Sequence, residues 1–458
     1  MTTEEKEGYH FIGIGGIGMS ALASILLQKG EKVTGSDMNA SLLVERLKKQ
    51  GAEVSVGHHG TFCKNPFAVV VSSAIREENP EVQAARLQNL PFIHRSELLA
   101  KLMKEYKPLL VTGTHGKTTT SSLLSHVLVH VGLDPSYAVG GMVASLGSNG
   151  GYGKGEYFVA EADESDGSFL NYTPFGAIVT NIDGDHFDYW KDMDALIEGF
   201  KTFTASVQSQ EDLFWCGDDD RLRSLQLSGT SYGFDESNDL WIQNFVQNGW
   251  KSHFDISWKG KEYLDVEIPL VGAHNVLNAS SVFGLCLQLG VEEEKIRSAF
   301  RAFRGVARRA ELKVQYKGIT ILDDYAHHPA EIFATLRALK KAIGKRRLIV
   351  AFQPHRYTRT RDCFHEFAQA FESADVVVLT DIYAATEEPI AGISATSLFE
   401  EIQTKRGSPL FYAPRKEMAK FLASKIGSDD LLVTMGAGDI THLGSELLQL
   451  WTGTKSSL

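Results

Sequence analysis

The segment GTHGKTTT, residues 113–120, combines the residue types that bind a phosphate group. A short apolar run precedes it, and small and apolar residues at helical spacing follow it. A strand, a glycine-rich turn and a helix in this order present backbone N–H groups to phosphate oxygens. Gly113 and Gly116 allow the backbone to turn tightly. Lys117 supplies a positive charge, and the hydroxyl of Thr118 is placed to bind a magnesium ion. We predict a loop that binds the phosphates of a nucleotide.

This loop departs from the common pattern GxxxxGK[ST], because Val111 stands where that pattern has its first glycine. The spacing here is GxxGKT, starting at Gly113. A lone Gly-Lys-Thr sequence can also be a turn without a ligand. The strand expected before it and the helix expected after it favour the phosphate-binding interpretation.

Carboxylates follow the next two expected strands, 157–160 and 177–180. The first strand leads into EADESDGSF, which starts at Glu161, and the second into NIDGDHFD, which contains His186. An acidic cluster is often a solvated loop, but magnesium bound to a triphosphate needs carboxylate oxygens. We predict that at least one of these carboxylates is a metal ligand and that His186 contacts the metal or a phosphate.

A second glycine-rich turn, GIGGIGM, follows an expected strand near the start of the chain. Gly13, Gly15 and Gly18 form the pattern GxGxxG, and Asp37 follows about 20 residues later, where a dinucleotide-binding fold has its ribose-binding acid. NAD is one possible ligand, and a turn without a ligand is another. Because such glycines recognise phosphate, any nucleotide diphosphate could bind. The ATP-type loop downstream favours a nucleotide-linked substrate over a redox cofactor.

Basic residues gather after the strand expected at 348–352, where the sequence is QPHRYTRTR. His355, Arg356, Arg359 and Arg361 then share one loop and first helical turn. In a chain with 46 basic and 57 acidic residues, such a local cluster indicates an anion site.

Two smaller groups of polar residues have two interpretations each. Arg308 and Arg309 could clamp a phosphate or could be solvated charges beyond a helix end. Asn275 and Asn278 lie three residues apart at an expected helix start. Capping explains one asparagine, and the second suggests an adenine or phosphate contact.

Alternating strands and helices predict an α/β protein with parallel sheets. At roughly 150 residues per domain, 458 residues suggest three domains. We place them at 1–107, 108–312 and 313–458. Within the second, alternating apolar and polar residues over 232–270 predict antiparallel strands added to the parallel sheet. The glycine-dense stretch 147–155 is expected to be a loop that reaches the active site.

The composition excludes several classes of protein. The acidic balance argues against a nucleic-acid groove or an anionic membrane surface. No apolar run approaches the roughly 20 residues of a membrane helix, and the N-terminal segment is polar. The cysteines form no CxxC pair, so neither a zinc site nor a disulfide framework is expected. These features predict a soluble cytoplasmic protein. The cysteines are Cys63, Cys216, Cys286 and Cys363.

Nine motifs, in this order over nearly the whole chain, resemble the Mur ligase family. They are HFIGIGGIGMS, GTHGKTTT, EADESDGSF, TNIDGDHFD, HNVLNA, RRAE, DDYAHHPAEI, FQPHRYTRT and GAGDI. The resemblance implies an N-terminal Rossmann-like domain for the UDP end of a sugar nucleotide and a central P-loop ATPase-type domain. It also implies a C-terminal Rossmann-like domain that closes over ATP and the amino acid. Ala310 departs from the family, which has an aromatic residue there, and so leaves open which arginine points inward.

The resemblance also implies residue roles. The UDP-sugar would meet Gly15, Gly16, Ile17, Gly18, Met19 and Ser73. The spacing after the glycine-rich turn adds Asp37 to this set. ATP would meet Gly113, Thr114, His115, Gly116, Lys117, Thr118, Thr119, Asn275 and Asp324. Magnesium would be held by Thr118, Glu161 and His186. The catalytic residues would be Lys117, His186, Arg308, Arg309 and His327. Arg356 and Arg359 would line the closed site near the amino acid.

The implied reaction is that of the members that join L-alanine to UDP-N-acetylmuramate for peptidoglycan. The lactyl carboxylate would attack the γ-phosphorus of ATP, and the amino group of L-alanine would attack the acyl phosphate. His186 or His327 could be the base, although a metal-bound His186 could not. The alternatives are a ligase that recycles a tripeptide onto the same UDP-sugar, a regulatory ATPase and a dehydrogenase. We expect a monomer or a homodimer.

Overall fold

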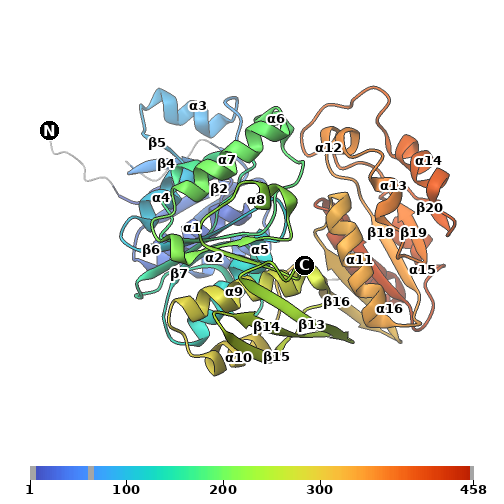
Figure 1. Ribbon diagram of the computed structural model, residues 1–458. Coiled ribbons are helices and arrows are strands. Elements are labelled where there is room, and N and C mark those ends of the chain that lie inside the picture. Colours follow the sequence, from blue (N-terminus) through green and yellow to red (C-terminus); the bar gives the residue numbers. More distant parts are fainter. Residues whose placement is uncertain (1–6, 60–65, 454–458) are drawn as a thin grey trace. The chain divides into compact units, whose positions relative to one another are not determined.

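The computed structural model describes residues 7–59 and 66–453 (Figure 1). Cys63 and the first and last residues therefore lie outside the described part. The chain forms two compact units. Unit 1 comprises Met1–Ile242, Ile256–Glu262 and Leu277–Arg304, and unit 2 comprises Gln243–Asp255, Tyr263–Val276 and Gly305–Leu458. The first predicted domain and most of the second lie in unit 1, whereas the segments 243–255, 263–276 and 305–312 of the second belong to unit 2.

The N-terminal part of unit 1 is a five-stranded sheet in the order β3-β2-β1-β4-β5, and every pair in it is parallel. Its strands are β1 (Tyr9–Ile12), β2 (Val33–Asp37), β3 (Glu53–Val56), β4 (Ala68–Val71) and β5 (Phe92–His94). The helices between them are α1 (Ile17–Gln28), α2 (Leu42–Lys49), α3 (Pro80–Leu87) and α4 (Arg95–Met103). The predicted parallel α/β domain is confirmed.

The central sheet has ten strands in the order β15-β14-β13-β12-β11-β10-β6-β9-β7-β8. Its first strands are β6 (Lys107–Thr112), β7 (Ser136–Val143), β8 (Ser148–Gly151), β9 (Tyr157–Glu161) and β10 (Gly176–Val179). The later ones are β11 (Leu213–Cys216), β12 (Thr230–Gly233), β13 (Leu240–Asn248), β14 (Lys251–Trp258) and β15 (Lys261–Ile268). The helices are α5 (Lys117–His130), α6 (Phe187–Trp190), α7 (Met193–Ala205), α8 (Asp220–Ser224), α9 (Ala273–Gln288) and α10 (Glu293–Ala302). Strands β13–β15, joined by short turns, are the antiparallel addition that the sequence predicts.

The remaining sheet lies in unit 2 and has the order β16-β17-β21-β18-β19-β20. Its strands are β16 (Glu311–Tyr316), β17 (Ile319–Asp324), β18 (Leu348–Phe352), β19 (Val376–Leu379), β20 (Leu410–Tyr412) and β21 (Leu431–Met435). The helices are α11 (Pro329–Ile343), α12 (Tyr357–Asp362), α13 (Phe367–Ala370), α14 (Ala395–Lys405), α15 (Met418–Ala423) and α16 (Leu443–Thr452). Apolar clusters involving α11 and α16 cover this sheet. Because β18 and β21 are buried throughout, β18 is a continuous apolar run and β21 is apolar except for the buried Thr434.

The glycine-dense stretch 147–155 is not the extended loop that the sequence suggests. It contains β8, which packs against α1. The Asn149 side chain donates to the Ile17 carbonyl at 2.6 Å and to Ser20 Oγ at 3.1 Å. A Cβ on Gly150 would lie 2.5 Å from the Ala21 carbonyl oxygen, so a side chain there would push the helix away. Gly150 therefore serves helix–strand packing.

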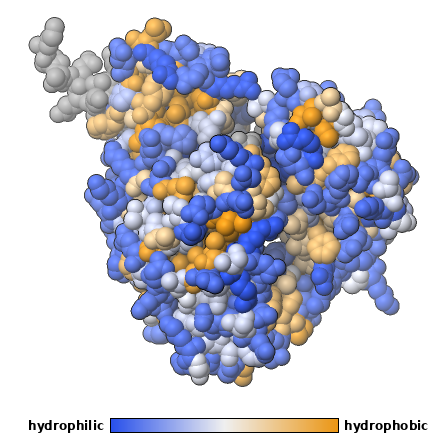
Figure 2. All heavy atoms as spheres, turned by 45° about the horizontal axis from the view of Figure 1, so that its top comes forward, coloured by the Kyte–Doolittle hydropathy of each residue, from blue (hydrophilic) through white to orange (hydrophobic). Residues whose placement is uncertain are grey.

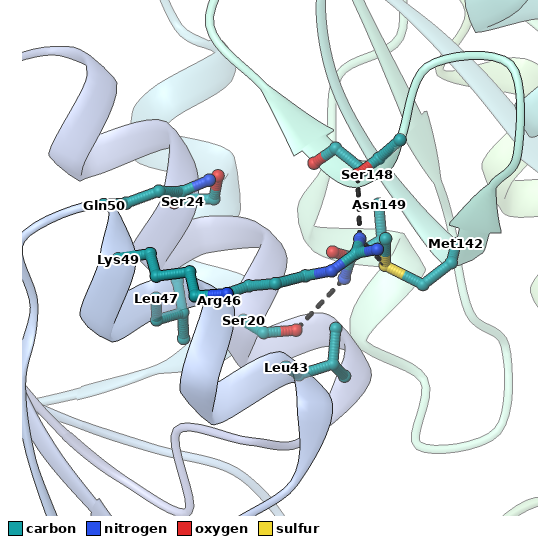
Figure 3. Close-up of a pocket in the computed structure, with 11 residues that line it drawn as sticks. Ser20, Ser24, Leu43, Arg46, Leu47, Lys49, Gln50, Met142, Ser148 and Asn149 are labelled. Atoms are coloured by element: carbon teal, nitrogen blue, oxygen red, sulfur yellow. Dashed lines mark hydrogen bonds between the residues drawn. The ribbon is translucent and has the colours of Figure 1, made fainter.

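A pocket opens beside this contact, between α1, α2 and the β7–β8 turn (Figure 3). Arg46 reaches across it from α2 and donates to the Gly147 carbonyl at 2.8 Å. Helix α2 is thus also tied to the β7–β8 turn, and the N-terminal sheet is fixed to the central one at two helices.

Helix α4 shows a second difference from expectation. The sequence suggests Ser96 as its cap, but His94 is the N-cap residue. Its ring accepts the Ser96 N–H at 3.4 Å, and the Glu97 carboxylate accepts the His94 N–H at 3.3 Å. Histidine is an uncommon cap, so sequence preference pointed to the serine.

Hydrophilic residues cover most of the face drawn in Figure 2, with smaller hydrophobic groups between them. No helix in the described part of the chain is long and apolar enough to cross a membrane.

Gly150→Ala should destabilise unit 1, because its Cβ would overlap the α1 backbone. Overpacking of this kind costs about 1–3 kcal/mol, so the midpoint of thermal unfolding should fall by a few degrees. Gly407→Ala is the control, since a Cβ there meets no atom within 4 Å. Equal midpoints for the two variants would contradict the packing role.

Candidate functional site

The predicted phosphate loop joins β6 to α5 in unit 1. Gly113 has a φ of 126° and Gly116 a φ of 86°, a region that only glycine adopts readily. A Cβ on Gly113 would also lie 2.1 Å from Thr180 Oγ1. The turn therefore requires both glycines, and Gly116 is the N-cap residue of α5. The backbone N–H groups of the first helical turn are thus available to an anion.

The segment that follows β10, residues 181–183, forms hydrogen bonds with this loop and fixes its conformation. The Thr114 N–H donates to the Asn181 carbonyl at 3.0 Å, and the His115 N–H donates to Asn181 Oδ1 at 2.9 Å. The Asp183 N–H donates to Thr114 Oγ1 at 2.8 Å. His115 Nε2 lies 3.2 Å from Asp183 Oδ2. These contacts hold the loop in shape without a ligand.

Lys117 has all its protons engaged. Its Nζ donates to the carbonyls of Gly113 at 2.7 Å and Thr114 at 3.2 Å, and to Glu164 Oε2 at 2.7 Å. Burial lowers the pKa of Lys117, but the charges of Glu164, Asp163 and Glu161, with the hydrogen bond to Glu164, together outweigh burial and raise the pKa above its usual value. Lys117 is therefore charged at neutral pH. Thr119 is buried in the same helical turn, with 8% of its surface exposed.

Sequence reasoning did not single out Glu164, the partner of Lys117. Its carboxylate is almost completely buried, with 1% of the side chain exposed. Burial raises its pKa, although the Lys117 charge opposes that rise. The second oxygen, Oε1, is buried and has no hydrogen-bond partner among the described residues. In the sequence, Glu164 is one of several acidic residues in EADESDGSF, and nothing else there distinguishes it.

Oxygen donors suited to magnesium lie next to the loop. Thr118 Oγ1 donates to Glu161 Oε1 at 3.2 Å, and the Gly140 N–H donates to Glu161 Oε2 at 3.0 Å. A hydroxyl and a carboxylate are the ligands that magnesium prefers, and the buried Glu164 oxygen adds a further acceptor nearby. These residues therefore fit the ion.

His186 begins α6 in the left-handed conformation, with a φ of 60°. Its N–H donates to Asp185 Oδ1 at 2.9 Å, and its Nε2 lies 3.5 Å from Asp185 Oδ2. Its ring is close enough to Asp163 and Glu164 that a positive charge on it would oppose the effect of burial on both carboxyl groups. The histidine thus faces the same acidic group as Lys117.

The N-terminal turn is held by the end of β2. The N–H groups of Gly13 and Ile14 donate to the Ser36 carbonyl at 2.8 and 2.9 Å. The Gly15 N–H donates to Asp37 Oδ2 at 2.9 Å. A Cβ on Gly15 would lie 2.8 Å from the same oxygen, so only glycine fits. The Asp37 carboxylate thus supports the turn in addition to any contact with a ribose.

The predicted UDP-sugar residues differ in exposure. Gly16 is the N-cap residue of α1, and Ile17 and Gly18 follow in its first turn. The Met19 side chain is buried, with 3% exposed, so only its backbone can face a ligand. Ser73 Oγ donates to Asp166 Oδ2 at 3.1 Å. Because Asp166 belongs to EADESDGSF, the two nucleotide-binding regions are directly connected in unit 1.

In unit 2, the two arginines have different environments. Arg308 Nη2 donates to the Gly436 carbonyl at 2.7 Å, and its Nε lies 3.4 Å from Asp323 Oδ2. Arg308 thus fixes the glycine turn after β21. Both guanidinium groups lie over the Tyr325 ring, that of Arg308 at 4.7 Å and that of Arg309 at 5.4 Å from its centroid. Asp324 accepts the N–H groups of Ala310 and Ala326, at 2.7 and 2.8 Å. Burial raises the Asp324 pKa to about 6.

Three residues of the predicted basic cluster lie together in unit 2, namely His355, Arg356 and Arg359, whereas the Arg361 side chain is 51% exposed and pairs with Asp362. Arg359 is 7% exposed, and its Nη1 lies 3.4 Å from His355 Nδ1. Arg356 begins α12, and its N–H donates to the Tyr383 carbonyl at 2.9 Å. Burial lowers the pKa of His355, and the charges of Arg359 and Arg356 lower it further, to about 4. A buried concentration of positive charge suits a carboxylate or phosphate ligand.

His327 lies beside this cluster, with its ring 5.9 Å from that of His355. Its Nδ1 donates to the Tyr325 carbonyl at 2.9 Å. Burial and the Arg359 charge lower its pKa to about 3. His327 is therefore neutral at pH 7 but a weak base, which argues against a role in deprotonating an ammonium group.

The two asparagines of α9 have separate surroundings. The Asn275 side chain donates to the Val271 carbonyl at 2.9 Å, at the helix start. Asn278 abuts the phosphate loop, since a Cβ on Gly116 would lie 2.8 Å from its Oδ1. Of the two, Asn278 supports the loop.

Acid should destabilise unit 2 through its buried neutral histidines. An unfolded histidine has a pKa of about 6.5, so the unfolded chain binds protons first as the pH falls. A histidine that stays neutral in the fold adds stability above pH 6.5 that is lost on acidification. At pH 5 the loss is up to about 2 kcal/mol for His327. In denaturant titrations, His327→Gln should lose less stability between pH 7 and 5 than the wild type.

His365→Gln is the control for this measurement, because 83% of the His365 side chain is exposed. It should keep the acid sensitivity of the wild type. If His327→Gln also kept it, His327 would not be the buried neutral group described above.

Three domain families match the chain in sequence. They are the Mur ligase family, catalytic domain, over residues 8–107, the Mur ligase middle domain over 111–286, and the Mur ligase, glutamate ligase domain over 308–438. The predicted three-domain architecture is therefore confirmed.

Relatives match over nearly the full chain. A UDP-N-acetylmuramate--L-alanine ligase of Protochlamydia amoebophila is 47% identical, over 96% of this chain and 98% of that protein. One of Anaeromyxobacter dehalogenans is 44% identical, over 96% and 97%.

Solved structures agree in fold. The UDP-N-acetylmuramate-alanine ligase MurC of Thermotoga maritima has a TM-score of 0.85 and 28% identity, covering 98% of this chain and 100% of that one. The murein peptide ligase of Psychrobacter arcticus has a TM-score of 0.73 and 23% identity, over 98% and 100%. With sequence, fold and phosphate loop in agreement, the chain belongs to the Mur ligase family.

Proposed function

We propose that this chain joins L-alanine to the lactyl carboxylate of UDP-N-acetylmuramate, converting ATP to ADP and phosphate. The product is UDP-N-acetylmuramoyl-L-alanine, a precursor of peptidoglycan. The observation that carries the proposal is the full-length similarity, at up to 47% identity, to ligases with this printed name. The charged, preformed loop around Lys117 supports it.

In the first step, the lactyl carboxylate attacks the γ-phosphorus, and the bond to the leaving ADP breaks. Both partners are anionic, so positive charge must balance the charge that gathers in the transition state. Lys117 supplies it at the β- and γ-phosphates. Arg309 is our candidate for a second cation, because Arg308 is already committed to the turn at Gly436.

Thr118 and Glu161 are the proposed magnesium ligands. The ion would supply additional neutralisation of the triphosphate charge. ATP phosphates would otherwise lie against Glu161 and Glu164, whose carboxylates repel them. The carboxylates of Glu161 and Glu164 therefore require a cation between them and the phosphates.

In the second step, the amino group of L-alanine attacks the acyl carbon, and the tetrahedral intermediate expels phosphate. The amine must first lose a proton. His186 is the better candidate base, provided that it is not a metal ligand, since His327 is too weak a base. Arg356 and Arg359 are proposed to bind the carboxylate of L-alanine. The acyl phosphate must be kept from water until the amine arrives.

The UDP part of the substrate is assigned to the N-terminal domain. Ile17, Gly18 and Met19 open α1 and offer their N–H groups to the diphosphate, beside the turn at Gly15 and Gly16. Ser73 would lie at the sugar, close to the acidic segment through Asp166. A cytoplasmic location and a monomeric or homodimeric state remain predictions from the sequence.

The test of the proposed function is phosphate release with Mg–ATP and UDP-N-acetylmuramate. It is run with L-alanine, with L-Ala-γ-D-Glu-diaminopimelate and without an amine. We expect release to depend on the UDP-sugar and on L-alanine. Release only with the tripeptide would make the chain a recycling ligase, and release without an amine would favour a regulatory ATPase.

Lys117→Ala should abolish ADP formation, with at least a thousandfold loss of kcat/KM, because the charge at the β- and γ-phosphates is lost. Its thermal unfolding should still show a folded protein. Lys201→Ala is the matched control, since Lys201 lies on α7 with 58% of its side chain exposed. Near-normal turnover of Lys117→Ala would refute the role of the loop.

A further inference from the structure

A fully buried carboxylate lies in the N-terminal domain, away from the phosphate loop. Glu81 is in the first turn of α3, and none of its side chain is exposed. Ser36 Oγ donates to its Oε2, and the His59 N–H donates to its Oε1 at 3.2 Å. His10 Nε2 and His58 Nδ1 lie 3.6 and 3.7 Å from Oε2.

Burying a carboxylate without partners costs far more than burying an apolar side chain, so this group needs its contacts. Burial raises the pKa of Glu81, but the nearby His10 ring and the hydrogen bond from Ser36 hold it below the usual value. Glu81 is therefore an anion in the folded protein. An apolar residue of similar size would fill the same space without burying a charge, so filling space is not the role of Glu81.

The contact with Ser36 connects Glu81 to the glycine-rich turn. The Ser36 carbonyl accepts the N–H groups of Gly13 and Ile14, and the neighbouring Asp37 accepts that of Gly15. Three successive N–H groups of the turn thus depend on two residues at the end of β2. Glu81 fixes the side chain of Ser36, which is itself completely buried.

The other contacts of Glu81 come from different elements of the same domain. His10 lies on β1, and His58 and His59 follow β3. His58 Nδ1 also lies 2.7 Å from Ser36 Oγ. The carboxylate therefore joins α3 to β1, to the end of β2 and to the segment after β3.

We propose that Glu81 is a positioning residue for the UDP-sugar: through Ser36 it holds the turn at Gly13–Gly15 in the conformation that receives the diphosphate. This inference rests on the proposed function. Glu81 does not touch the substrate. It determines how well the backbone N–H groups are aligned with the phosphate oxygens, and so it acts on affinity for the UDP-sugar and not on ATP or L-alanine.

Glu81→Gln tests this most directly. Glutamine keeps the shape but turns an NH₂ group toward either Ser36 or His59, both of which donate. We expect the KM for UDP-N-acetylmuramate to rise at least tenfold, with kcat and the KM values for ATP and L-alanine within twofold of the wild type. Ser36→Ala should give the same pattern, and it tests the proposal if Glu81→Gln fails to fold.

Glu77→Gln is the matched control. Glu77 pairs with Arg86, but 68% of its side chain is exposed, and it should leave every kinetic constant unchanged. A KM for the UDP-sugar within twofold of the wild type in folded Glu81→Gln would overturn the proposal. So would an equal loss across all substrates, which would indicate a general structural role.

Calorimetric titration with UDP separates this proposal from the proposed function. Weaker UDP binding by Glu81→Gln than by the wild type supports the positioning role, even if the wild type forms no amide. Unchanged UDP binding overturns it, as does a wild type that binds no UDP. A wild type that binds UDP but does not ligate L-alanine would contradict the proposed function alone.

Discussion

The buried ion pair between Lys117 and Glu164 is the interaction on which the nucleotide site depends. Taking two charges out of water is costly, and breaking such a pair by removing one partner is more costly still. The pair, at 2.7 Å, keeps Lys117 charged and directed at the loop carbonyls. The positive charge is therefore in position before a ligand binds. A phosphate that binds to Lys117 must compete with Glu164 for it.

Parallel sheets explain why the chemistry gathers where it does. The phosphate loop, the acidic segment and the segment with His186 follow β6, β9 and β10, which are neighbours in one sheet. The carboxyl ends of parallel strands share one edge, so residues far apart in sequence meet there. The same geometry brings the turn after β1 beside Ser36 and Asp37 at the end of β2.

Local patterns predicted the parts of the site that a short segment specifies. Gly113, Gly116 and Lys117 were identifiable because a strand, a turn and a helix are encoded together. Tertiary partners were not identifiable: one acid in EADESDGSF looks like another, so Glu164 was missed. The same limit hid the packing of Gly150 on α1 and the commitment of Arg308 to the turn after β21, since each depends on an element distant in sequence.

The proposed first step requires the loop around Lys117 to direct the γ-phosphate to the lactyl carboxylate. It is tested most directly with UDP-N-acetylmuramate that carries ¹⁸O in that carboxylate, together with Mg–ATP and L-alanine. If an acyl phosphate forms, its bridging oxygen leaves with phosphorus, and mass spectrometry should find one ¹⁸O atom in each released phosphate. Released phosphate without ¹⁸O would contradict the account, because ATP would then have been cleaved without activating the carboxylate.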